Sequence, residues 1–301
     1  SVAGSFSRAS SLPPVERPNK ATLVCHRLTE AQIPRPHDHL NMRIGLTVGE
    51  SLDRIDALAD RFAFVELGIA ETAPDVDRER VAAALEAADV DLCVHLPFKQ
   101  VVSTPVPAMN DAIVSHKRTL LEWAGRMGAE KAVLHGTVRD PYDTGQRDTF
   151  AAQLNRIVTA GQDAGVEVVV ENVGHQKNGM QLSVLGDIAE EVNAPICFDV
   201  GHAYMEEGHD GIKRFLKYHG EQVSHLHVHD VRRRGDTHLP IGAGEIDYGL
   251  VGESLDGFDG TVAVEVFCDD RPLLEDTASR IARTFGKPFV ASGLDASTTE
   301  Q

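Results

Sequence analysis

Residues 166–201 read VEVVVENVGHQKNGMQLSVLGDIAEEVNAPICFDVG. Two runs of apolar, mostly β-branched residues, 166–170 and 195–198, enclose the stretch SVLGDIAEEV, in which apolar positions recur at helical spacing. This order predicts a strand, a helix and a second strand parallel to the first. Each run is followed directly by an acidic residue, Glu171 after the first and Asp199 after the second.

The same alternation continues along the chain in both directions. Eight strands are expected, at RIGLTV (43–48), FAFVELG (62–68), DLCVHLP (91–97), KAVLHG (131–136), VEVVVEN (166–172), PICFDVG (195–201), VSHLHVHD (223–230) and TVAVEVF (261–267). Helical spacing marks the stretches at 51–62, 78–89, 113–128, 149–165, 183–192 and 272–286. Repeated βα units of this number predict an α/β fold, a closed (β/α)₈ TIM barrel in a single domain. A doubly wound sheet would need a glycine-rich phosphate turn after the first strand, where the sequence is LTVGES.

The two ends of the chain differ from this pattern. Residues 1–41 are rich in Ser, Pro and Arg and have no sustained periodicity, which predicts a disordered leader. The alternative is that translation starts at Met42, which opens the first strand pattern, and that residues 1–41 come from a start codon assigned too early. We expect the metal-binding barrel to span 42–287 and the last residues, 288–301, to form a flexible tail.

Composition narrows the classes of protein. The chain has 46 acidic and 29 basic residues and a net charge of −17, so its surface repels nucleic-acid backbones and is expected to be a hydrated, salt-adapted one. The four cysteines, Cys25, Cys93, Cys197 and Cys268, form no C-x-x-C pair and are expected to be reduced in a cytoplasmic protein. No apolar run approaches the length of a membrane span, and no membrane partner is expected.

Potential metal ligands recur at the same place in successive units. In a closed barrel, the carboxyl ends of the strands meet at one mouth, where active sites of this fold are built. Seven successive strands end there in such a side chain: Glu66, His95, His135, Glu171, Asp199, His227 or His229, and Glu265. Glu171 and Glu265 end strongly apolar strands, so each must be paired, protonated or bound to a metal. Structural ion pairs are the alternative, but no basic residue occupies an equivalent strand end.

Three neighbouring patterns add candidates of different strength. Strand 223–230 has period two and places three histidines on one face, which cannot all be ligands: His225, His227 and His229. His202 follows Asp199 in the spacing D-x-x-H, so both side chains can reach the mouth. Asp236 and His238 lie in the long loop RRRGDTHLPIGAGEID, where a solvated loop is the default interpretation.

Taken together, the motifs HLPF, VLHG, VVVEN, FDVGH, HVHD, DTHLPIGAGEID and VAVEV resemble, in this order, the xylose-isomerase-like barrel superfamily. That superfamily contains sugar isomerases and epimerases and also the endonuclease IV class of apurinic nucleases. The resemblance covers about residues 42–285. It places the metal ligands on Glu171, Asp199, His227 and Glu265. It matches the additional ligands of the nuclease's three-zinc site to His95, His135, His202, Asp236 and His238.

The resemblance implies a metal-dependent sugar or sugar-phosphate isomerase or epimerase that transfers a proton through an enediolate. Glu171 and Glu265 would carry the proton, while Glu66, which resembles a strand-two glutamate of the isomerase-like branch, and His202 would contact substrate. The implied cofactor is Mn²⁺, Mg²⁺ or Co²⁺, or Zn²⁺ if the additional histidines are used. The implied partner is a small sugar, and a homo-oligomer is left open.

Two other classes of function stay open. An endonuclease IV-like, zinc-dependent apurinic endonuclease would use all nine ligand positions and would bind nucleic acid. The loop HLPIGAGEID, the glutamate in FVELG and the scarcity of aromatic residues (5%) favour sugars instead. A barrel that binds ligands without catalysis is the third class. The number of metal ions separates the first two, because sugar chemistry needs about one ion per chain and the nuclease about three.

Overall fold

The computed structural model of the chain describes residues 42–71, 77–143, 145–174, 177–233, 235–287 and 289. The leader predicted at 1–41 lies outside the described residues, and so does the predicted tail apart from Phe289. The ring of Phe289 lies 6.0 Å from that of Phe62.

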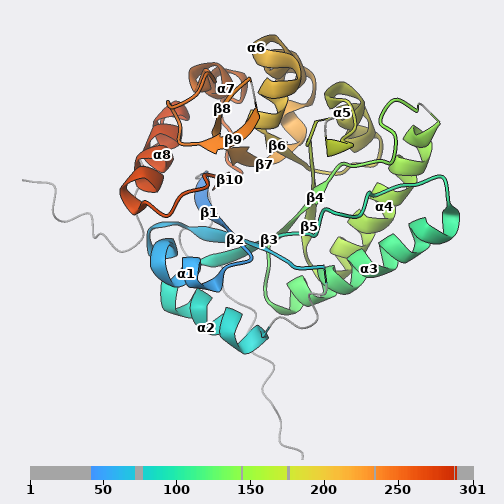
Figure 1. Cartoon of the computed structure of the whole chain (residues 1–301), viewed down its shortest axis with the longest axis horizontal. Helices are drawn as coiled ribbons and strands as arrows, with labels where there is room; N and C mark the ends of the chain where they lie inside the picture. Colours follow the sequence, from blue (N-terminus) through green and yellow to red (C-terminus); the bar gives the residue numbers. More distant parts are fainter. Residues whose placement is uncertain are drawn as a thin grey trace, which may run out of the picture. The chain divides into compact units, whose positions relative to one another are not determined.

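Eight parallel strands close into a barrel, and helices surround it (Figure 1). The neighbouring strands follow the order β1-β10-β7-β6-β5-β4-β3-β2 and back to β1. Their bounds are β1 Arg43–Gly49, β2 Phe64–Gly68, β3 Asp91–His95, β4 Lys131–His135, β5 Glu167–Glu171, β6 Ile196–Asp199, β7 Val223–Val228 and β10 Thr261–Val264. The (β/α)₈ TIM barrel predicted from the sequence is confirmed, and each predicted strand lies at the expected place in the chain.

Eight α-helices connect or follow the strands in the described residues. They are α1 Leu52–Leu58, α2 Arg78–Ala88, α3 Pro107–Arg126, α4 Gln146–Ala164, α5 Leu182–Glu191, α6 Val200–His219, α7 Tyr248–Ser254 and α8 Arg271–Thr284. Short 3₁₀ turns follow α1 at Ala59–Arg61 and α6 at Gly220–Gln222. Six of the helices match the predicted stretches, while α6 and α7 were not marked by helical spacing. In the described part of the chain, no helix combines the length and apolarity needed to cross a bilayer.

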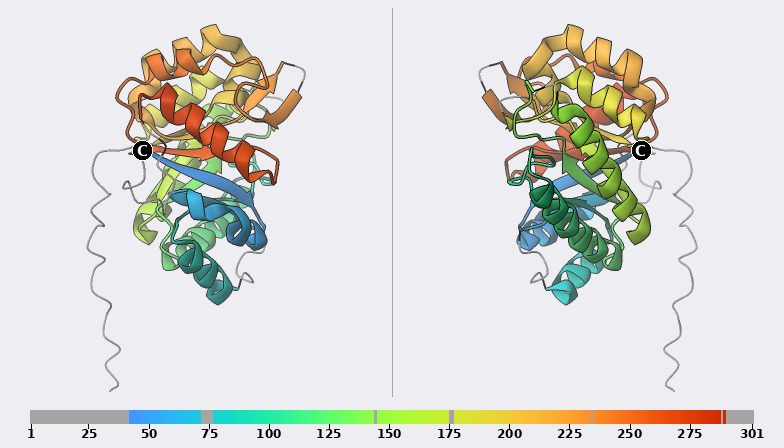
Figure 2. Two further views of the ribbon diagram at one scale, coloured as in Figure 1. Left: turned by 90° about the vertical axis from the view of Figure 1, so that its left-hand side faces the viewer. Right: turned by 90° about the vertical axis from the view of Figure 1, so that its right-hand side faces the viewer.

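The loop after β7 contains a small antiparallel hairpin that was not predicted. Its strands are β8 (Asp230–Arg232) and β9 (Gly235–Leu239), and Figure 2 shows it standing out from the body of the barrel. The default interpretation of this loop as fully solvated is wrong, because His238 on β9 is only 7% exposed. The hairpin therefore brings polar side chains over the barrel rather than leaving them in water.

Side chains inside the barrel change from charged to apolar to charged along its axis. Near the amino ends of the strands, Arg43 pairs with Asp91 at 2.9 Å and Lys131 with Glu167 at 2.7 Å. Above them lie two small apolar clusters, Phe64 with Cys93 and Ala263, and Val133 with Val169 and Cys197. Most of the acidic and imidazole groups expected from the sequence lie above these clusters, at the carboxyl ends, whereas Glu66 is level with Cys93. The main hydrophobic core lies outside the barrel wall, between strands and helices.

Candidate metal centre

The first group of converging side chains joins the ends of β3, β4 and β5. The Nε2 atoms of His95 and His135 lie 3.2 Å apart, and they lie 3.3 and 3.2 Å from Oε2 of Glu171. Ligand atoms of a tetrahedral Zn²⁺ bound at ~2.0 Å would be ~3.3 Å from one another. The spacing of these three atoms therefore fits one ion.

A second group surrounds His227 on β7. Its Nδ1 lies 3.3 Å from Oε2 of Glu265, 3.7 Å from Oε1 of Glu171 and 3.9 Å from Oδ2 of Asp199. The structure thus brings together the four side chains that the resemblance placed in the metal site. Glu171 contributes one oxygen to each group, so its carboxylate lies between them.

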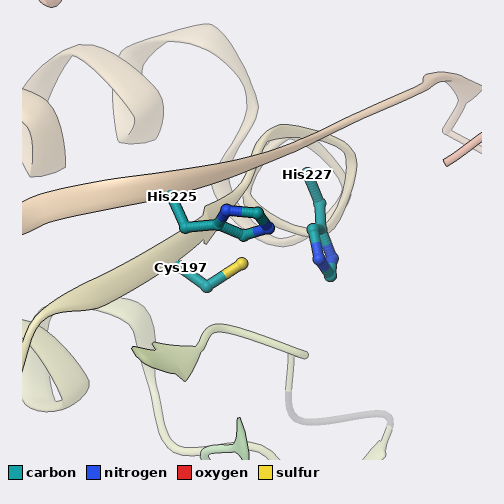
Figure 3. Close-up of side chains that lie close together, drawn as sticks. All are labelled: Cys197, His225 and His227. Carbon is teal, nitrogen blue, oxygen red and sulfur yellow. The ribbon is translucent and has the colours of Figure 1, made fainter. Parts of the chain in front are cut away.

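Figure 3 shows His227 beside His225, the preceding inward-facing residue of β7, with the thiol of Cys197 directed into the same space. His225 lies deeper in the barrel and is fully buried. Its Nδ1 lies 2.6 Å from Oγ1 of Thr261. This imidazole therefore belongs to the polar packing under the mouth and not to the second group of ligands.

Four of the imidazoles each have one ring nitrogen beside an acceptor outside the ligand groups. The pairs are His95 Nδ1 with the Leu96 carbonyl at 3.0 Å, His202 Nδ1 with the Asn172 carbonyl at 3.1 Å, His238 Nδ1 with the Glu265 carbonyl at 3.0 Å, and His227 Nε2 with the Glu66 carboxylate at 3.0 Å. A neutral imidazole that donates there presents the lone pair of its other nitrogen to the mouth. Metal-ligating histidines are commonly held in this way.

Several buried atoms of the same cluster have no hydrogen bond. They are Glu171 Oε2, His227 Nδ1, His229 Nδ1, Asp236 Oδ1 and Glu265 Oε2. A buried polar atom without a partner is costly, and five of them at one place fit the ligands of a cation better than they fit poor packing. The donor set, carboxylate and imidazole, suits Zn²⁺, Mn²⁺ or Co²⁺.

A third group forms where the hairpin meets α6. Nε2 of His202 lies 3.4 Å from Oδ2 of Asp236, and Nε2 of His238 lies 3.1 Å from Oδ1 of the same carboxylate. His229 joins this group, and its ring stacks on that of His238 with centroids 4.0 Å apart. The ammonium of Lys177 also lies here, hydrogen-bonded to Asp236 and 3.0 Å from His202 Nε2.

The pKa directions reflect an excess of negative charge. Burial alone would raise the pKa of Glu171, but His135 and His227 outweigh it and hold that pKa well below its ordinary value. Burial would likewise raise the pKa of Glu265, which His227 and His238 lower instead. Burial would lower the pKa of His227, which Cys197 and the surrounding carboxylates raise well above its ordinary value. The carboxylates are therefore ionised and attract protons or a metal ion to the imidazoles.

Glu66 lies elsewhere than expected. Its side chain has no exposed surface, and its Oε2 accepts hydrogen bonds from Nε2 of His225 at 3.1 Å and of His227 at 3.0 Å. Its other oxygen, Oε1, lies 3.4 Å from Oγ1 of Thr47. The substrate contact expected for Glu66 stays a prediction, and these contacts suit a residue that orients His227. His202, the other expected substrate contact, is only 3% exposed and faces Asp199 and Asp236.

A cavity of about 450 Å³ opens beside the ligands, and His95 and Glu265 form part of its wall. Two exposed aromatic rings also line it, Phe98 and Phe267. Each ring stacks on an imidazole of the ligand groups, Phe98 on His135 with centroids 4.9 Å apart and Phe267 on His238 with centroids 3.9 Å apart. A ligand in this cavity would meet both the ionised carboxylate and an apolar face.

Sequence reasoning missed three residues of this region and left a fourth, His229, as an alternative to His227. Lys177 lies in a loop, and Phe98 follows the HLP motif where no periodicity marks it. Phe267 ends the last strand pattern without a polar signal, and His229 was one of two alternatives that the period of two could not separate. Only the three-dimensional arrangement shows that all four border the candidate metal centre.

The fold and the site together define a class of protein. It is an α/β barrel that gathers imidazoles and carboxylates at the carboxyl ends of its strands. The chain belongs to the xylose isomerase-like TIM barrel family, whose model matches residues 55–285.

Two relatives by sequence are archaeal. The chain is 25% identical over 238 residues to uncharacterized protein MJ1614 of Methanocaldococcus jannaschii, covering 77% of this chain and 93% of the relative. It is 29% identical over 192 residues to uncharacterized protein MJ1311 of the same organism, covering 59% of this chain and 64% of the relative.

Solved structures share the fold at low sequence identity. A D-tagatose 3-epimerase-like protein superposes with a TM-score of 0.66 at 21% identity, covering 81% of this chain and 97% of the other. A D-psicose 3-epimerase from Clostridium cellulolyticum, solved with D-tagatose, gives 0.64 at 16% identity, with 82% and 100% coverage. A Thermus thermophilus protein, TTHB071, solved after soaking with ZnCl₂, gives 0.62 at 22% identity, with 80% and 99% coverage.

Proposed function

We propose that the chain is a metal-dependent sugar or sugar-phosphate isomerase or epimerase that moves a proton through an enediolate. The observation that carries this proposal is the convergence of Glu171, Asp199 and Glu265 on Nδ1 of His227, beside a cavity large enough for a small sugar. The sugar epimerases among the structural neighbours support the same substrate class.

Glu171, Asp199, His227 and Glu265 would hold the ion. A divalent ion bound there would polarise the carbonyl of an open-chain sugar and acidify the neighbouring C–H. Mn²⁺, Mg²⁺ or Co²⁺ suits these four ligands, and Zn²⁺ is favoured if His95 and His135 also bind.

Proton transfer falls to the two glutamates. Strands β5 and β10 are three places apart in the barrel, so Glu171 and Glu265 approach His227 from different directions. Both carboxylates have lowered pKa values and are ionised near neutral pH, as a proton acceptor must be. One would remove the proton, and the other would return one to the same or the opposite face. Of these two glutamates, Glu265 lines the cavity.

The apolar rim would position the sugar. Phe98 and Phe267 are 56% and 67% exposed, and rings of this kind pack against the C–H faces of sugars while the hydroxyls turn to polar groups. A small ligand held between them would place its carbonyl end toward Glu265.

Glu171→Gln tests the catalytic assignment. We expect the variant to stay folded and to turn over the sugar that wild type accepts about 10³-fold more slowly or worse. The reason is that it loses both a proton acceptor and an anionic ligand. Glu167→Gln, on the same strand but at the opposite end of the barrel beside Lys131, is the matched control. The assays would use a panel of ketoses, inososes and their phosphates in metal-loaded protein. Retained turnover in Glu171→Gln would remove this residue from the mechanism.

An endonuclease IV-like apurinic endonuclease is the second candidate. The observation that favours it is the third group of ligands, since the structure places His202, Asp236 and His238 together at the hairpin. Cleavage of duplex DNA containing an abasic site, with no turnover of any sugar in the panel, would favour this function over the first.

A further inference from the structure

Lys177 occupies the place where a metal ion of the third group would bind. Its ammonium is hydrogen-bonded to Oδ2 of Asp236 and lies 3.0 Å from Nε2 of His202. It is the only Lys or Arg in the described part of the chain that forms an ion pair with a carboxylate of the three ligand groups. A positive charge from the protein itself therefore lies among ligands that suit a divalent ion.

The hydrogen-bond directions agree with this placement. Nδ1 of His202 lies 3.1 Å from the Asn172 carbonyl, which can only accept, so in the neutral ring the Nε2 lone pair faces the ammonium at 3.0 Å. Asp236 accepts from the ammonium through Oδ2, while its Oδ1 faces Nε2 of His238 at 3.1 Å. The ammonium thus uses two acceptors that a metal ion would otherwise bind.

Without Lys177, the same place would hold a full ligand set. His202 Nε2 and Asp236 Oδ2 contact the ammonium directly, and His238 Nε2 lies 3.1 Å from the other oxygen of Asp236. The Asp236 carboxylate and the imidazoles of His202 and His238 make a set that binds Zn²⁺ or Co²⁺ well. An ammonium and a divalent ion cannot share these acceptors, because their charges repel and a metal needs the lone pairs at ~2.0 Å.

We propose that the Lys177 ammonium is a built-in cation that replaces a divalent ion at the hairpin, so that the chain binds one ion fewer than its ligand positions allow. This inference rests on the proposed function only in taking the other groups as the metal site. It also says where the remaining ions would bind. Because Lys177 neutralises the third group, they would lie beside Glu171 and Glu265, where the sugar would bind.

Counting metal ions tests this proposal without any activity assay. Wild type, Lys177→Met, Lys177→Arg and Lys213→Met would be stripped with a chelator, equilibrated with excess Zn²⁺, freed of unbound metal, and measured by native mass spectrometry and elemental analysis. Lys177→Met keeps the length of the side chain and removes its charge. Lys177→Arg keeps the charge, and Lys213→Met makes the same substitution at an exposed position on α6.

We expect Lys177→Met to bind one more Zn²⁺ per chain than wild type, and the other two variants to match wild type. In Co²⁺-loaded protein, the extra ion should add visible absorption only in Lys177→Met. Equal counts of one or more ions in wild type and Lys177→Met would overturn the inference and leave the proposed function standing. The inference would also fall if wild type bound three ions, because Lys177 would then have moved aside. No bound ion in either protein would instead remove the metal site and the proposed function with it.

Discussion

Replacing Glu66 by Gln tests how the barrel orients its candidate metal ligand, His227. The Glu66 carboxylate lies under His227, fully buried, and accepts from its Nε2 at 3.0 Å. This bond keeps the proton on Nε2 and presents the Nδ1 lone pair to Glu265, Glu171 and Asp199. Gln preserves the shape and one acceptor oxygen but removes the negative charge, and its amide group can hold the ring in the opposite tautomer.

The expected loss follows from the type of contact. Hydrogen bonds to a charged acceptor are about twice as strong as neutral ones, and a carboxylate behind a metal-bound imidazole also increases its basicity. Removing such a partner costs about 10- to 100-fold in metal affinity, which equals about 1.4 to 2.8 kcal/mol. The substitution should act on binding of the ion and not on the fold, because the side-chain volume hardly changes.

The assay is titration of chelator-stripped protein with Co²⁺ or Mn²⁺ against a competing chelator, which gives the dissociation constant directly. Glu66→Asp, which keeps the charge, should recover part of the affinity, whereas Glu167→Gln at the far end of the barrel should bind like wild type. Circular dichroism would confirm that each variant is folded. If Glu66→Gln binds the ion as tightly as wild type, the orienting role is refuted.

Two further predictions concern stability. Lys117 is 1% exposed, and burial lowers the pKa of its ammonium from 10.5 to about 8. Because the unfolded chain then binds the extra proton between these values, the burial cost is fully present below pH 8 and disappears as pH rises to 10.5. A pKa that lies 2.5 below its ordinary value corresponds to about 3 kcal/mol of lost folding stability. Removing the ammonium also removes its hydrogen bond to the Pro97 carbonyl, which offsets about 1 kcal/mol of this gain. Urea unfolding should therefore show Lys117→Met about 2 kcal/mol more stable than wild type at pH 7 and not more stable at pH 10.5; equal stability at pH 7 would contradict this. The net charge of −17 predicts a melting temperature that rises between low and molar KCl, and a temperature indifferent to salt would count against a salt-adapted surface.

The barrel was predictable because its signal is local and repeated. Each strand is a short apolar run, and in runs such as VEVVVE the polar residue at the carboxyl end is visible in the sequence itself. The closed topology then places Glu171, Asp199 and Glu265 at one rim without further information. Their apolar surroundings also indicated that these carboxylates need a partner.

Other elements gave no such signal. The helix α6 begins at GHAYMEEGHDG, where three glycines obscure the helical spacing, and Gly208 has φ of 67° at a kink. Gly201 lies against His229, since a Cβ at Gly201 would lie 2.2 Å from Cε1 of that ring. These glycines reflect contacts across the fold, which one sequence cannot show. The hairpin strands, with the sequences DVR and GDTHL, are mostly polar and so lack the apolar run that marks the barrel strands.

The roles of single side chains depended most on tertiary structure. Glu66 has the sequence context of a mouth residue, yet it lies beneath the mouth because β2 directs it toward His225 and His227. Lys177 has the context of a solvated loop, yet its ammonium reaches Asp236 on a hairpin 59 residues away. Sequence reasoning therefore named the candidate ligands that converge at the mouth, but not the arrangement of the side chains around them.

Anomalous X-ray diffraction from crystals loaded with Mn²⁺ or Co²⁺ would locate the ion directly. The account predicts a peak at the mouth of the barrel, within bonding distance of Glu171, Asp199, His227 and Glu265. A well-ordered crystal with these four side chains in place and no anomalous peak among them would contradict it.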